Sequence, residues 1–329
     1  MPVPPDRMRL LLLVALPLAL ALVPPAARLL DNVYLITLVR QALIYALAAM
    51  ALDFIMGYGR LVSFGHAAFF GLGAYTVGIL GTHYMQDLAL LFGWAGSNEA
   101  LLAWPLAMAI SGAYALLVGL ISLRTSGIYF IMITLAFAQM VYYLFVSLSA
   151  YGGLTGLSLW LPNTIAGFDL LADGLYFYYL CLTLLLLAWW LLARIVASRF
   201  GQVLQGCRQN ERRMRALGYR TYGYKLTAFV ISGAVTGLAG ALLANHAGYV
   251  SPGLMHWSMS GELIIIVLLG GLSSLIGPIY GAIILLLLEQ LLTTITPYWQ
   301  IILGPILILV VLLFKGGLYG TLTRRGSQA

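Results

Sequence analysis

A polar, basic segment over residues 198–221 lies between long apolar runs and constrains this chain more than any other feature. Its only acid is Glu211. A segment with this many charges does not lie inside a bilayer, where each charge costs several kcal/mol, so it must stand on one side of a membrane. Its six basic residues are Arg199, Arg208, Arg212, Arg213, Arg215 and Arg220.

The rest of the chain has the composition of an integral membrane protein. Of its 329 residues, 62% are hydrophobic and only 8% are charged, whereas soluble domains have about 25% charged residues. Apolar windows near the ~20 residues needed to span a bilayer recur throughout, and they lack the alternation of a membrane β-barrel. We therefore predict an all-α integral membrane protein that forms one domain over residues 1–329.

The apolar runs predict about ten transmembrane helices, the first of them a spanning helix rather than a cleaved signal peptide. They cover roughly 10–27, 33–56, 61–81, 100–122, 127–148, 175–196, 225–247, 258–275, 277–295 and 299–314. With the N-terminus inside, 15 of the 17 basic residues fall on the inner side. This asymmetry satisfies the positive-inside rule, so both termini and residues 198–222 are predicted to be cytoplasmic. Beyond the six arginines, the inner residues are Arg7, Arg9, Arg60, Arg124, Arg194, Lys225, Lys315, Arg324 and Arg325, and the outer acids are Asp31, Asp87, Glu99, Asp169 and Asp173.

Motifs for metal, nucleotide or nucleic-acid chemistry are missing from the sequence. It has no GxxxxGK[ST] string, no HExxH and no Cys/His set with metal-ligand spacing. The two cysteines, Cys181 and Cys207, are predicted to be reduced thiols. The net charge of +7 follows the membrane topology rather than a nucleic-acid surface. We expect no metal site and no catalytic constellation.

Three acids within the predicted helices allow two interpretations. Asp53 is predicted to be hydrated at the inner end of its helix or paired with Arg60, while Glu262 and Glu289 lie in later helices. They either form interhelical hydrogen bonds or mark a substrate or proton path. The second interpretation keeps an ion- or proton-coupled secondary transporter as an alternative function.

Two glycine- and serine-rich clusters predict breaks between helices on the inner side. One covers Gly57–His66 and the other covers Gly270–Pro278. Such breaks occur at transport pathways, whereas most other glycines, among them Gly233, Gly237 and Gly240, are expected to permit close helix packing. His66 is expected to tie neighbouring helices together.

The basic segment predicts a short amphipathic helix over Gln202–Leu217, with Ser198 capping its start and Gly218 its end. Its broken apolar stripe consists of Val203, Leu204, Cys207, Met214 and Leu217. The arginines favour a helix on anionic lipid, and the polar residues Gln205, Gln209, Asn210 and Glu211 favour a docking helix for a cytoplasmic protein. Composition leaves both interpretations open.

Several motifs resemble those of the permeases of branched-chain amino acid ABC import systems, and of their LivM-type subunit in particular. The first two are Arg60–Tyr75, RLVSFGHAAFFGLGAY, and Gly127–Gln139, GIYFIMITLAFAQ. Further similar motifs are Gly152–Gly156, Lys225–Phe229, Gly237–Ala241, Ser251–Pro252, Leu269–Gly271 and Gly277–Pro278. In the basic segment the resemblance covers Ser198, Gly201, Arg208, Asn210, Glu211, Ala216, Leu217 and Gly218.

The resemblance implies a permease subunit that moves a branched-chain amino acid or a similar small solute from periplasm to cytoplasm across the bacterial inner membrane. It implies a LivH-type permease partner, a periplasmic binding protein and two ABC ATPases, which carry the ATP and Mg²⁺, so this chain binds no cofactor of its own. The basic segment then becomes the helix that couples to the ATPases, through Ser198, Gly201, Arg208, Asn210, Glu211, Arg212, Leu217 and Gly218. The candidates for the pathway or its gates are Ser63, Gly65, His66, Phe69, Tyr75, Thr134, Gln139, Gly270, Gly271, Ser273, Gly277 and Pro278.

Overall fold

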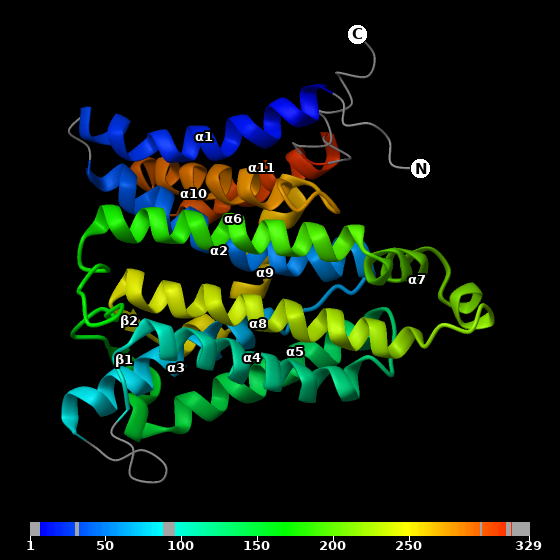
Figure 1. Cartoon of the computed structure of the whole chain (residues 1–329), viewed down its shortest axis with the longest axis horizontal. Helices are drawn as coiled ribbons and strands as arrows, with labels where there is room; N and C mark the ends of the chain where they lie inside the picture. Colours follow the sequence, from blue (N-terminus) through cyan, green and yellow to red (C-terminus); the bar gives the residue numbers. More distant parts are fainter. Residues whose placement is uncertain (1–6, 30–32, 88–95, 297, 314–316, 318–329) are drawn as a thin grey trace.

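The computed structural model describes residues 7–29, 33–87, 96–296, 298–313 and 317. Helices run side by side along the long axis of the molecule, and α7 projects beyond them at one end (Figure 1). The helices are α1 (Arg7–Leu29), α2 (Val33–Gly59), α3 (His66–Gln86), α4 (Ala100–Ser122), α5 (Ile128–Ser147), α6 (Gly174–Ala197), α7 (Arg199–Ala216), α8 (Thr221–Ala247), α9 (Trp257–Gly270), α10 (Gly277–Ile295) and α11 (Trp299–Leu313).

Each of the ten predicted apolar segments corresponds to a helix of the described chain. Six of these helices are long and apolar enough to cross a membrane, namely α2, α4, α5, α6, α8 and α10. The apolar stretches in α1, α9 and α11 are shorter. The predicted helix 61–81 begins later, at His66, and the predicted helix 258–275 ends earlier, at Gly270. Both differences arise because the Gly/Ser breaks occupy residues 60–65 and 271–276 as non-helical backbone.

The two ends of the bundle differ in charge, as the sequence predicted. Arg194 lies in the last turn of α6, directly before α7, and Arg60 lies in the α2–α3 connection at the same end. At the opposite end, Asp173 caps α6 by accepting a hydrogen bond from the Leu175 N–H. Of the charges used to orient the chain, Asp31, Lys315, Arg324 and Arg325 lie outside the described residues.

The end away from α7 is closed by short irregular elements. Two two-residue strands, β1 (Leu157–Ser158) and β2 (Tyr249–Val250), pair antiparallel in the register Leu157 to Val250. The 3₁₀ turns Ser149–Tyr151, Gly153–Thr155 and Pro252–Met255 lie beside them. This glycine-rich stretch therefore folds back along the bundle end as turns rather than as a further helix.

The core is centred on α2. Every residue from 42 to 55 of this helix is buried, and a helix that is apolar and buried all round lies in the interior of its bundle. By contrast, α5 buries only Phe130, Thr134, Ala138 and Val141, which lie on one side. The rest of α5 is a largely apolar outer surface.

Glycines allow α8 to approach its neighbours at backbone distance, which confirms the packing prediction for three of them. A Cβ on Gly240 would overlap the carbonyl oxygen of Phe70 in α3, and one on Gly237 would overlap Ser111 in α4. A Cβ on Gly233 would overlap that of Ala115 in α4. Because lipid offers no hydrophobic drive for helix association, this close packing holds the helices together.

We expect Gly240→Ala to lower the stability of the folded chain by about 1–3 kcal/mol, the usual cost of overpacking, because the new methyl group pushes α8 away from α3. Gly223→Ala is the matched control, because Gly223 lies in the same helix and a Cβ there would have no atom within 4 Å. Thermal unfolding in detergent compares the two. An equal midpoint for both variants would show that the α3–α8 contact is not tight.

Candidate functional site

The projecting segment α7 is two helical pieces rather than the single helix that the sequence predicted. The backbone breaks at Asn210, whose φ of −156° and ψ of 98° are not helical. The Asn210 side chain then caps the second piece, because its Oδ1 accepts a hydrogen bond from the Arg213 N–H at 3.0 Å. A cap within the segment explains why one continuous helix does not form.

The second piece folds back and ends as the sequence predicted. The Met214 side chain packs against Gly206, where a Cβ would lie 2.7 Å from the Met214 sulfur. Gly218 has a φ of 87°, and the N–H groups of Gly218 and Tyr219 donate to the carbonyls of Arg215 and Met214. This is a Schellman ending, whose left-handed position favours glycine. The prediction for Ser198 is wrong, because its hydroxyl donates to the Ile195 carbonyl instead of capping α7.

The first piece of α7 buries apolar side chains against the bundle. Gly201, Val203, Leu204 and Cys207 are buried, and burial raises the pKa of the Cys207 thiol. In the second piece Met214 is half-buried against Gly206 and Leu217 is 66% exposed. The predicted stripe is therefore buried in its first piece and only partly covered in its second. Arg212 and Arg213 are also exposed.

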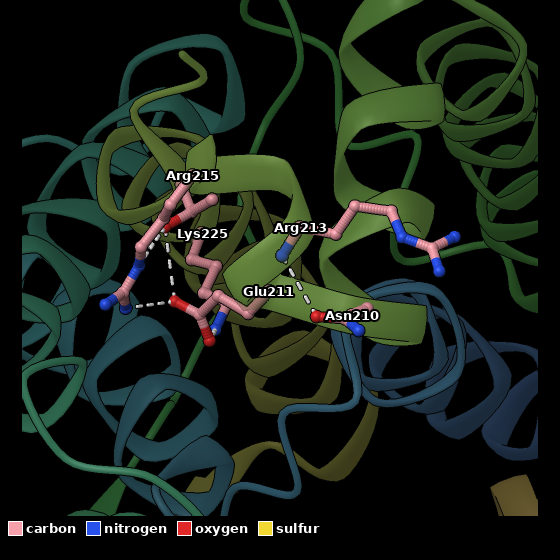
Figure 2. Close-up of polar contacts among 6 residues, drawn as sticks. Asn210, Glu211, Arg213, Arg215 and Lys225 are labelled. Atoms are coloured by element: carbon pink, nitrogen blue, oxygen red, sulfur yellow. Dashed lines mark hydrogen bonds and ion pairs between the residues drawn. The ribbon is translucent and has the colours of Figure 1, made fainter. Parts of the chain in front are cut away.

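Glu211 fastens the second piece to the start of α8. Its carboxylate accepts hydrogen bonds from Lys225 Nζ at 2.5 Å, Arg215 NH2 at 2.6 Å and Thr221 Oγ1 at 3.2 Å (Figure 2). Burial raises the pKa of Glu211, but the hydrogen bonds from Lys225 and Arg215 outweigh it and hold the pKa below its ordinary value. The carboxylate is therefore charged at neutral pH and braces the projecting segment.

The break at residues 271–276 is held by Asp53, which does not pair with Arg60 as one prediction had it. Asp53 is fully buried near the end of α2. Its carboxylate accepts the N–H groups of Ser273 at 2.8 Å, Ser274 at 3.2 Å and Leu275 at 3.1 Å. The N–H groups of this break need a side-chain acceptor because Ser273 and Leu275 have positive φ values and form no helical hydrogen bonds. Asp53 therefore has a structural role.

Ser273 also connects this break to α7. Its hydroxyl donates to the Gly57 carbonyl at 2.8 Å and accepts a hydrogen bond from Arg208 NH1 at 2.7 Å. Its own carbonyl accepts from the Tyr58 hydroxyl at 2.7 Å. The end of α2, the α9–α10 break and the first piece of α7 thus meet at one residue.

The other break, at residues 60–65, is held by hydroxyl groups from two helices and by one of its own. Thr134 Oγ1 of α5 accepts the Phe64 N–H at 3.3 Å. Ser260 of α9 accepts the Ala67 N–H at 2.9 Å and donates to the Phe64 carbonyl at 2.7 Å. Ser63 lies within the break and accepts the Gly65 N–H at 3.1 Å.

The expectation that His66 ties neighbouring helices is confirmed. Its Nε2 lies 2.8 Å from Ser232 Oγ of α8, and that hydroxyl donates to the Ala51 carbonyl of α2 at 2.5 Å. Phe69 packs its ring edge-on against those of His66 and Phe229. A single buried cluster thus joins α2, α3 and α8.

The structure brings the pathway candidates together only in part. Gly270 and Gly277 pack backbone to backbone across the 271–276 break, with Gly271 and Pro278 beside them. Ser63, Gly65, His66, Phe69 and Thr134 gather around the 60–65 break. Tyr75 lies nine residues beyond His66 in α3, about 14 Å along the helix. Its ring packs at a tilt against that of Phe145, with the ring centroids 4.3 Å apart. Gln139 lies further along α5 than Thr134, so these two are not part of either break.

The sequence reasoning missed the side chains that satisfy the breaks. Ser232 and Ser260 are fully buried, and small polar residues in apolar helices are the signal that could have identified them. Thr221, which accompanies Lys225 at Glu211, was missed as well. No group of three metal-ligating side chains occurs in the part of the chain that the structure describes.

We expect Asp53→Asn to lower stability by about 1–3 kcal/mol, because the amide nitrogen faces a backbone N–H and leaves it unsatisfied. Asp173→Asn is the control, since Asn caps a helix as well as Asp does. Thermal unfolding in detergent measures both variants. Unchanged stability of Asp53→Asn would contradict the structural role of Asp53.

Comparison with known proteins agrees with the motif resemblance. A family model described as the permease component of the branched-chain amino acid transport system matches residues 34–312. Two LivM proteins, high-affinity branched-chain amino acid transport system permease proteins of Salmonella typhimurium and Escherichia coli K12, are 28% and 29% identical to the chain. Each alignment covers 84% of this chain and 68% of the relative.

A more distant relative is the autoinducer 2 import system permease protein LsrC of Escherichia coli O9:H4. It is 30% identical over 153 residues, which cover 44% of each chain. No solved structure matches the chain. Because the family model spans most of the sequence, this chain belongs to the family of permease components of the branched-chain amino acid transport system.

Proposed function

We propose that this chain is the permease subunit of an ATP-driven ABC importer and that α7 couples it to two ATPases. The observation that carries the proposal is that α7 projects beyond the bundle while Arg208 and Glu211 bind it to two different parts of that bundle. A projecting helix with such attachments can transmit a push from a soluble partner. In this arrangement the α7 end is cytoplasmic, as are both termini, and about ten helices span the inner membrane.

The substrate is proposed to be a branched-chain amino acid or a similar small amphipathic solute, carried from periplasm to cytoplasm by alternating access. The two LivM relatives, which are permease proteins of branched-chain amino acid transport systems, support this class. A periplasmic binding protein would deliver the solute, and a LivH-type permease would supply the second half of the pathway. ATP and Mg²⁺ would be bound by the ATPases, and this chain would do no covalent chemistry.

The two breaks are proposed to act as gates near the cytoplasmic side of the pathway. Both are non-helical backbone held by side chains of other helices, so a shift of those helices can move them. The Ser273 contacts with Gly57 and Arg208 place the 271–276 break directly in the path between α7 and α2. A displacement of the first piece of α7 would therefore reach this break through the Arg208–Ser273 contact.

Co-purification with the cognate ATPases, followed by a screen of solutes delivered by the binding protein, tests this function. We expect leucine-like solutes to stimulate ATP hydrolysis and to be accumulated in proteoliposomes only when ATP is present. Sustained uphill uptake by the permease without ATPases would instead support a secondary transporter.

The attachment of α7 through Glu211 generates a charge-swap prediction. Glu211→Lys and Lys225→Glu should each reduce solute-stimulated ATP hydrolysis and uptake about tenfold, because each leaves like charges in contact. The double variant Glu211→Lys with Lys225→Glu should recover part of the loss, since the pair is restored in reverse. Uptake and hydrolysis in proteoliposomes measure this, with membrane insertion of each variant as the control. Wild-type rates in both single variants would contradict coupling through this pair.

A further inference from the structure

A cleft of about 440 Å³ opens at the α7 end of the bundle. It lies between the α2–α3 connection, the α4–α5 connection, the break in α7 and the start of α8. Its polar lining residues are Arg60, Thr125, Ser126, Arg208, Gln209, Glu211 and Lys225, and its apolar ones include Leu61, Val62, Leu123, Phe130 and Ile131.

The charges in this cleft do not balance. Glu211 is its only acid, and that carboxylate is already bound by Lys225, which lines the cleft, and by Arg215. Arg208 donates to a neutral hydroxyl, Ser273 Oγ. Arg60 is exposed and forms no ion pair within the described residues. The guanidinium of Arg60 therefore lines the cleft without a counter-charge among the described residues. The guanidinium of Arg208 has only the buried Asp53 carboxylate near it, and that carboxylate already accepts three backbone N–H groups.

We propose that this cleft binds a small anion carrying a phosphate or carboxylate group, held by Arg60 and Arg208. A guanidinium presents a planar set of N–H donors that matches the oxygen pairs of phosphate and carboxylate groups. The hydroxyls of Thr125 and Ser126 add polar lining, and the cleft also reaches the first turn of the 20-residue helix α5, whose dipole favours a negative charge. These two features support the site, but the arginine pair defines it.

The apolar side of the cleft narrows the class of ligand. A bare inorganic ion would leave the partly exposed side chains of Val62 and Ile131 uncovered, whereas an organic phosphate or carboxylate would cover them. The exposed apolar surface of Ile128, Tyr129 and Met132 on α5 begins beside the cleft. The anion can therefore come from a soluble organic molecule or from a phospholipid headgroup whose chains follow α5.

Occupancy of the cleft would have a mechanical consequence. Arg60 belongs to the α2–α3 connection and Arg208 to the first piece of α7, and the structure shows no bond between them. An anion held by both would tie α7 to a second connection of the bundle, in addition to the 271–276 break. This inference does not depend on the solute that the chain transports.

The test uses the full chain in nanodiscs of phosphatidylcholine, titrated with inorganic phosphate by calorimetry. We expect saturable binding that Arg60→Gln weakens about tenfold or more, since it removes a charge-assisted contact. Arg124→Gln is the matched control, because Arg124 is an exposed arginine between two lining residues, Leu123 and Thr125, but does not line the cleft itself. Arg208→Gln provides a second variant should Arg60→Gln fail to fold.

A second arm identifies the source of the anion. Native mass spectrometry measures retained lipid after reconstitution in a mixture of phosphatidylcholine and phosphatidylglycerol. Phosphatidylglycerol retained by the wild type and lost in Arg60→Gln assigns the site to a headgroup, while phosphate binding with no lipid retention assigns it to a soluble anion. Absence of both, or an equal loss in Arg124→Gln, overturns the proposal.

Discussion

A break in a membrane helix exposes backbone N–H and C=O groups that lipid cannot satisfy, and the rest of this structure depends on how that cost is met. Asp53 meets it at the 271–276 break with three hydrogen bonds from one carboxylate. Thr134 and Ser260 meet it at the 60–65 break with hydroxyls. Each solution draws on a helix distant in sequence, so satisfying the breaks also fixes the packing of the bundle.

The same requirement explains why an acid lies in the most buried helix. A carboxylate taken out of water without partners would cost several kcal/mol, yet Asp53 is fully buried. The N–H groups of the break offset the cost of burying this carboxylate, and the carboxylate satisfies N–H groups that would otherwise lack an acceptor. The acid and the break are therefore one structural unit formed by α2 and the α9–α10 connection, and neither would be stable in this position without the other.

Much of the helical fold could be predicted from apolar length alone, because about 20 apolar residues allow few structures other than a membrane helix. The breaks could be predicted because Gly, Ser and Pro cluster at them. The partner of Asp53 could not, since its contacts lie 220 and more residues away in sequence. The kink at Asn210 was also missed, because the turn that follows depends on Met214 reaching Gly206, which amphipathic spacing does not encode.

The two pieces of α7 are attached to the bundle by different kinds of contact, so a movement of each piece passes to a different part of the bundle. The first piece is held by buried apolar contacts and by Arg208 to Ser273, so its motion passes to the 271–276 break and α2. The second piece is held mainly by the charges at Glu211, so its motion passes to the start of α8. Both routes lead to the contact of Ser232 in α8 with the Ala51 carbonyl in α2, where His66 also binds. In an importer of the proposed kind, a displacement of α7 by the ATPases would thus converge on the residue at which α3 begins.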